Sequence, residues 1–88
     1  MTVDLIVVHF RALSALAKLL ESLEESEKAF ESYTVHVANN GHEEPTLHGW
    51  ARAGRIRLYQ NGTNQGFARA VNRVLRATQA PYIMVVNP

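Results

Sequence analysis

Two hydrophobic patterns alternate along this chain of 88 residues. Short apolar runs rich in branched residues are typical of strands, and they occupy Val3–Val8, Tyr33–Ala38, 56–59 and Tyr82–Val86. Between these runs, apolar residues recur every three or four positions, a spacing that predicts amphipathic helices at about 12–28, Thr46–Ala53 and Phe67–Thr78. The resulting order is strand, helix, strand, short helix, strand, helix, strand.

Strands that alternate with helices favour a parallel sheet with right-handed crossover connections. The first run is interrupted only by Asp4, so we expect its strand to be buried on both faces. The pattern therefore predicts an α/β fold with three Rossmann-like layers, in which a mainly parallel four-stranded sheet has helices on both faces. The length fits a single domain over residues 1–88.

Composition narrows the classes of function. The net charge is +1, without the basic stripe that a nucleic-acid interface needs, so we expect no nucleic-acid partner. The chain has no cysteine, which excludes disulfides and cysteine-ligated zinc. Neither a signal peptide nor an apolar run of transmembrane length is visible, so we expect a cytoplasmic protein.

Polar, turn-forming residues follow every expected strand. In open α/β sheets, ligands bind at the carboxyl ends of the strands. Those ends carry His9-Phe10-Arg11, Asn39-Asn40-Gly41-His42, the loop 60–65, and Asn87-Pro88. The opposite ends look like ordinary solvated strand starts, and they carry Asp4, Ser32, Arg55 and Pro81. This asymmetry predicts a binding edge at the carboxyl ends.

Other ligand motifs are missing from the expected binding edge. The segment after the first strand contains no glycine, so it matches neither the dinucleotide-binding nor the Walker pattern. His9 and His42 should end adjacent strands, but no carboxylate accompanies them at ligand spacing, so we predict no metal site there. His36 and His48 carry no functional signal.

Four segments resemble, in order, the motifs of one enzyme family. Leu5–Arg11 is similar to V-I-V-N-Y-N, and Val37–His42 to V-V-D-N-G-S. Asn64–Asn72 matches N-x-G-F-A-x-A-x-N, the most specific of the four, and Tyr82–Pro88 matches a strand leading to N-P-D. The whole chain thus resembles the N-terminal, nucleotide-binding half of family 2 glycosyltransferases, which have the GT-A fold. The bacterial rhamnosyltransferase-like branch is the most similar.

The resemblance implies an inverting enzyme that transfers a sugar from a UDP- or dTDP-sugar to an acceptor hydroxyl, in the synthesis of glycans or cell-surface polysaccharide. Val8, His9 and Phe10 would lie against the base and ribose. Asn39 stands where the family has an acid that binds the pyrimidine, and its amide can both donate and accept. The full set of implied nucleotide-binding residues is Val8, His9, Phe10, Asn39, Asn64, Gly66 and Asn87.

The resemblance also implies a divalent cation in the complete enzyme. The last Asp of N-P-D holds Mg²⁺ or Mn²⁺, which neutralises the diphosphate leaving group. Asn87 and Pro88 match the first two positions, and the ligand would be the next residue. We therefore expect a fragment truncated before the metal-binding Asp, with no metal bound, no catalytic residue of its own, and no transferase activity alone.

A different class of function stays open: a non-catalytic α/β module that binds a nucleotide or a protein. Truncation would also expose sheet edge and apolar surface, so a homodimer is a further hypothesis. Association with a membrane would come only through the acceptor of the parent enzyme.

Simpler structural roles compete with ligand binding near the third segment. Asn64 is a strong candidate to cap the following helix, which does not exclude a ligand nearby. We expect Phe67 in the core and Asn72 in a hydrogen bond to a neighbouring loop. Three arginines share one helical stripe, which we interpret as a solvated face, with a phosphate clamp as the alternative, and they are Arg69, Arg73 and Arg76.

Overall fold

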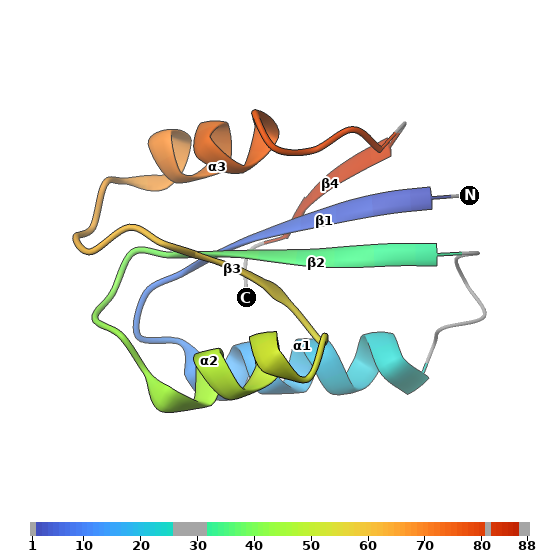
Figure 1. The fold of residues 1–88 in the computed structure, drawn as a ribbon, viewed down its shortest axis with the longest axis horizontal. Coiled ribbons are helices and arrows are strands. Elements are labelled where there is room, and N and C mark those ends of the chain that lie inside the picture. The colour runs from blue at the N-terminus through green and yellow to red at the C-terminus, as the bar shows by residue number, and fades with distance from the viewer. Residues whose placement is uncertain (1, 26–31, 81, 87–88) are drawn as a thin grey trace.

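A computed structural model describes residues 2–25, 32–80 and 82–86 of the chain (Figure 1). All seven expected elements are present in the expected order. They are β1 (Thr2–His9), α1 (Leu13–Glu25), β2 (Ser32–Asn39), α2 (Pro45–Arg52), β3 (Arg57–Gln60), α3 (Phe67–Leu75) and β4 (Tyr82–Val86). The main difference is that α3 ends at Leu75, before the Thr78 predicted from its apolar spacing.

The four strands form one sheet in the order β3-β2-β1-β4, and every pair is parallel. Helices α1 and α2 cover one face of the sheet and α3 covers the other (Figure 1). The prediction of a three-layer α/β fold with helices on both faces is therefore confirmed. Because all strands run in one direction, their carboxyl ends share one edge.

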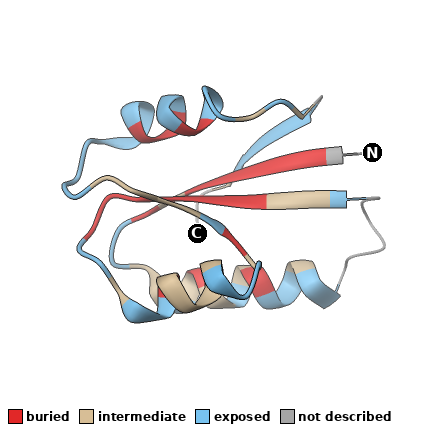
Figure 2. Ribbon diagram, in the orientation of Figure 1, coloured by how far each residue is buried: buried red, intermediate tan, exposed pale blue. Residues whose placement is uncertain are grey.

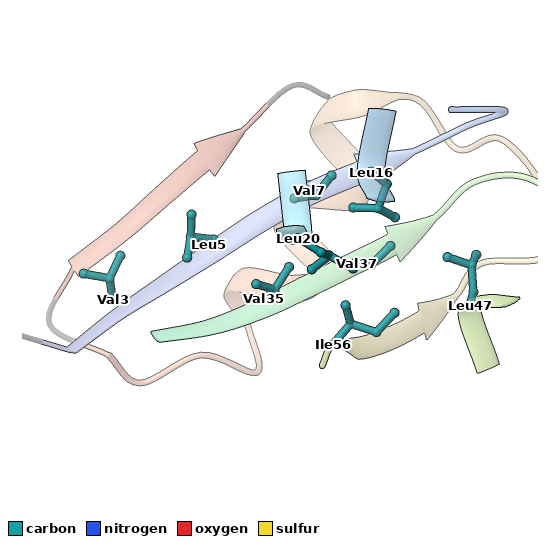
Figure 3. Packing of buried hydrophobic residues seen from close by; sticks show 9 residues of the cluster. All are labelled: Val3, Leu5, Val7, Leu16, Leu20, Val35, Val37, Leu47 and Ile56. Atoms are coloured by element: carbon teal, nitrogen blue, oxygen red, sulfur yellow. The ribbon is translucent and has the colours of Figure 1, made fainter. Parts of the chain in front are cut away.

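The larger core lies between the sheet and the helices α1 and α2. Alternate residues of β1 and β2 point to this face, where Leu16 and Leu20 of α1 meet them (Figure 3). Its buried members are Val3, Leu5, Val7, Leu16, Leu20, Val35, Val37, Leu47 and Ile56. Figure 2 shows most of β1 and the carboxyl half of β2 as buried, with Val8 half-buried, which agrees with the apolar run of β1.

The smaller core lies under α3, where Ala70, Val71 and Val74 pack on Ile6 and Ala38 of the sheet. This contact corrects one sequence-based expectation. Phe67 is 52% exposed, not part of the core, and Leu75 is also exposed. The sheet residues lie opposite the segment from Ala70 to Val74, so the side chains at the two ends of the helix extend beyond the contact.

A buried polar cluster at the amino half of the sheet was also missed. Asp4 is 7% exposed and His36 only 2%, so Asp4 is not an ordinary solvated strand start. His36 Nε2 lies 3.1 Å from Asp4 Oδ1, and His36 Nδ1 is 2.9 Å from the Tyr59 hydroxyl. Alternation places all three side chains on the α3 face, and burial raises the pKa of the Tyr59 phenol.

Strand β4 is an edge strand with an apolar, exposed surface. Its only neighbour among the described strands is β1. Four of its side chains are more than two-fifths exposed (Figure 2), and they are Tyr82, Ile83, Met84 and Val85. Within the described residues, no helix is both long and apolar enough to cross a lipid bilayer.

One surface ion pair yields a small, pH-dependent contribution to stability. Arg55 Nε and Nη2 each donate to a carboxylate oxygen of Glu24 at 2.8 Å, and these bonds lower the pKa of Glu24. Because water screens an exposed pair, we expect Glu24→Gln to lower the free energy of unfolding by less than about 1 kcal/mol. Stability from ionised Glu24 is present above its unfolded-state pKa and is lost as the pH falls through the lowered native pKa.

Urea unfolding of both proteins, at neutral pH and in acid, measures this contribution. The free energies of unfolding of the wild type and of Glu24→Gln should converge in acid. The matched variant Glu25→Gln should have the free energy of unfolding of the wild type at both pH values. A Glu24→Gln deficit that persists in acid would contradict the ion-pair explanation.

Candidate functional site

Three strand ends meet at one edge of the sheet, which we call the carboxyl rim and define by residues 9–11, 39–42 and 60–66. The register pairs His9 with Asn39, and Asn39 with Gln60. Strand β4 approaches the same edge, since Val86 pairs with Val7. Asn87, the last of the predicted nucleotide-binding residues, lies outside the described residues.

Asn39 is completely buried at the centre of the rim. Its Oδ1 accepts a hydrogen bond from the Gly41 N–H at 2.9 Å, which fixes the orientation of the amide. Its Nδ2 donates to the His42 carbonyl and to Gln60 Oε1, both at 3.1 Å. The side chain therefore orders the loop after β2 and ties it to the end of β3.

Asn40 is also buried and joins three segments of the chain. Its Oδ1 accepts from Asn61 Nδ2 at 2.7 Å, while its Nδ2 donates to the Gly66 carbonyl at 3.2 Å and to Asn64 Oδ1 at 3.4 Å. The Asn40 N–H also donates to the His9 carbonyl at 2.8 Å. The Asn40 side chain thus holds the loop before α3 against the end of β2, and its backbone N–H ties the same point to the end of β1.

The start of α3 is organised by Asn64 and Gly66. Asn64 Oδ1 accepts from the Gly66 N–H at 2.9 Å, so Asn64 turns the loop before the helix. The N-cap itself is Gly66, which corrects the prediction that Asn64 caps the helix. Gly66 has φ 82°, a backbone conformation that side-chain-bearing residues rarely adopt, and this explains glycine at the position.

The end of β1 places its three predicted site residues in different surroundings. His9 is completely buried, with Nε2 3.2 Å from Glu44 Oε1 at the start of α2. Val8 packs against the smaller core. Phe10 is 43% exposed, and the Arg11 guanidinium lies 5.1 Å from its ring centroid. A Cβ added to Gly41 would be 3.9 Å from the Phe10 ring, so Phe10 forms an exposed aromatic surface beside the loop after β2.

Six of the seven predicted nucleotide-binding residues are therefore at or directly below one edge, and whether they contact a nucleotide stays a prediction. The residues that sequence reasoning missed are Asn40, Gln60 and Asn61, which were treated as turn and loop residues. The available signal was the concentration of amide side chains at the ends of two consecutive strands.

Neutral hydrogen-bonding groups dominate the rim. Amides can donate and accept at once, which suits a ligand whose ring edge presents both kinds of group. Among the described residues, no three His, Asp or Glu side chains are grouped so as to hold a metal ion. His9 is directed to Glu44. The prediction for Asn72 is not met, since this residue is exposed on α3 and has no hydrogen bond to a neighbouring loop within the described parts of the chain.

Comparison with known proteins gives one match. The family model described as "Glycosyl transferase family 2" matches residues 4–88. No curated protein and no solved structure matches the chain significantly.

Proposed function

Because the chain belongs to glycosyl transferase family 2, we propose that its carboxyl rim binds the nucleotide of a sugar donor, UDP- or dTDP-linked, for transfer to an acceptor hydroxyl. The observation that carries this proposal is the convergence of an exposed aromatic ring and a network of amides at one edge of a parallel sheet. That edge is where open α/β sheets bind ligands.

Phe10 is the residue that we assign to the pyrimidine. Its exposed ring offers a flat apolar face, and base–aromatic stacking is favourable for any base. Asn39 acts as a positioning residue, since its own polar groups are occupied by Gly41, His42 and Gln60. It holds the loop after β2 beside Phe10, so backbone groups of that loop meet the edge of the base.

In the proposed reaction, the acceptor oxygen forms a bond to the anomeric carbon while the bond to the diphosphate oxygen breaks, with inversion. The acceptor proton passes to a base, and no residue of this chain is assigned that role. A divalent cation, Mg²⁺ or Mn²⁺, would stabilise the departing diphosphate. The resemblance assigns this cation to the third position of N-P-D, whose first two positions Asn87 and Pro88 match.

Several finer features stay predictions. They are rhamnosyltransferase-like specificity, a cytoplasmic location, membrane association through the acceptor alone, and a homodimer. The exposed apolar edge strand β4 supports the last of these. The alternative function is a non-catalytic α/β module that binds a nucleotide or a protein. One observation favours the protein-binding form: the position of the family's pyrimidine-binding acid is an asparagine whose polar groups are engaged in internal hydrogen bonds.

Titration calorimetry with UDP and with dTDP tests the proposal, each with and without Mn²⁺. We expect metal-independent binding by the rim, and we expect Phe10→Ala to weaken it about 10-fold through lost stacking. The matched control is Tyr82→Ala, which removes an aromatic ring that is also exposed, where β4 pairs with Val3 at the opposite end of the sheet. Equal affinity of Phe10→Ala and the wild type, or no binding of either nucleotide, would overturn the assignment of the rim.

A further inference from the structure

A shallow arginine groove runs along the outer surface of α3. It has a volume of about 410 Å³, and its lining residues are Gln65, Arg69, Asn72, Arg73 and Arg76. Every lining side chain is polar, three carry positive charge, and none is a carboxylate. The groove begins at Gln65, in the rim segment before α3, and extends along the helix to Arg76.

Arg73 at the centre of the groove is already held in place. Its Nη1 donates to the Gln60 carbonyl at 2.9 Å and to Asn61 Oδ1. Its guanidinium also lies 6.0 Å from the centroid of the Tyr59 ring. These contacts leave the side chain little rotational freedom to lose when a ligand binds.

The flanking arginines are one turn away on either side. Arg69 precedes Arg73 by four positions and Arg76 follows it by three, so the three guanidinium groups share one helical stripe. Within the described chain, no ion pair or side-chain hydrogen bond is assigned to Arg69 or Arg76. Like charges at these spacings destabilise a helix, so an anion that bridges them would relieve repulsion as it binds.

We propose that the arginine groove binds the phosphate group of an anionic ligand, at a site separate from the aromatic surface of the rim. Guanidinium groups present paired donors that match phosphate oxygens, and Gln65 and Asn72 add neutral amide donors. The stripe is thus a phosphate site and not only a solvated face. The phosphate could belong to a small soluble ligand or to a lipid headgroup, and the two sources share this chemistry.

Two binding assays test the proposal on the whole chain. In the first, inorganic pyrophosphate is titrated into the protein. In the second, the fraction of protein that sediments with vesicles is measured, for vesicles of phosphatidylcholine alone and of phosphatidylcholine mixed with phosphatidylglycerol. We expect binding in at least one assay, weakened by added salt. The double variant Arg69→Gln/Arg76→Gln should weaken it about 10-fold. Glutamine retains helix propensity, and the loss of repulsion should leave the melting temperature unchanged or raised.

The matched control is Arg52→Gln/Arg57→Gln, which removes the same net charge from exposed positions on α2 and β3. Pyrophosphate binding that depends on the groove indicates a soluble phosphate ligand, and binding only to the anionic vesicles indicates a headgroup. Either result supports the proposal. Absence of binding in both assays, or equal losses in the two double variants, overturns it. Phe10→Ala should leave the binding of pyrophosphate and of anionic vesicles unchanged. The test is therefore independent of the assignment of Phe10 to the pyrimidine.

Discussion

Replacing Asn39 with aspartate is expected to destabilise the fold by about 3 kcal/mol at neutral pH, although it introduces the acid that the family motif carries at this position. One carboxylate oxygen can still accept from the Gly41 N–H. The other would face the His42 carbonyl and Gln60 Oε1, to which the amide now donates. A buried negative charge would then oppose two acceptors, and both donated hydrogen bonds would be lost.

The destabilisation by Asn39→Asp should depend on pH. Burial and the two neighbouring oxygens disfavour the charged form, so the pKa of the introduced carboxyl should lie above its unfolded value of about 3.9. A native pKa that is raised in this way lowers stability as the pH rises and restores it as the carboxyl is protonated. The protonated acid can also donate one of the lost hydrogen bonds.

Urea unfolding at neutral pH and near pH 4 measures this effect for the wild type and for Asn39→Asp. The deficit of the variant should shrink by at least half at the lower pH. The control is Asn72→Asp, which makes the same change at an exposed position on α3 beside three arginines and should not lower stability at neutral pH. A deficit that does not vary with pH would show that the side chain is not bonded as described.

The sheet was predictable because each strand is indicated by its own short stretch of sequence. The branched run Val3–Val8 and the shorter run Tyr82–Val86 indicate strands, and their alternation with amphipathic stretches favours parallel pairing. Parallel pairing then brings the ends of β1 and β2 to one edge without any knowledge of side-chain contacts. For the same reason, the location of the carboxyl rim was predictable.

The pairing of side chains within the rim was not predictable. Asn39 and Asn40 are identical neighbours in the sequence, yet one orders its own loop and the other reaches Asn61 and Gly66. The difference follows from the path of the loop before α3, which depends on the positive φ at Gly66. A pattern of residue types contains no information about such a path.

Burial was misjudged from the sequence at two places. The apolar stripe of α3 predicts a helix to Thr78, but Leu75 is its last residue and is exposed. At the amino half of the sheet, Asp4 and His36 are buried beside each other on the same face as α3. Alternation indicates that they share a face, but only the three-dimensional arrangement shows that they are in contact.

Asn40→Ala is expected to lower the free energy of unfolding by about 2 kcal/mol and to weaken nucleotide binding about 10-fold. The substitution leaves the Asn61 amide without its acceptor and frees the loop before α3 from the end of β2. The loop would then sample more conformations, and binding at the rim would have to order it again. Asn40→Asp keeps the acceptor for Asn61 but sets a buried negative charge against the Gly66 carbonyl and Asn64 Oδ1. At neutral pH it should therefore lose at least as much stability as Asn40→Ala, and it should recover part of that stability when the carboxyl is protonated.

Urea unfolding of the two Asn40 variants should therefore show aspartate at least as destabilised as alanine at neutral pH and less destabilised near pH 4. UDP titration at neutral pH should show weaker binding for both variants than for the wild type. Amide hydrogen exchange offers a local readout, because the Ala70 N–H donates to the Gly66 carbonyl at the start of α3. Its protection should fall further than the lost global stability accounts for, since the loop opens independently of the sheet. If Ala70 exchange and UDP affinity were unchanged in Asn40→Ala, the loop before α3 would not depend on Asn40, and the amide network would not preorganise the rim.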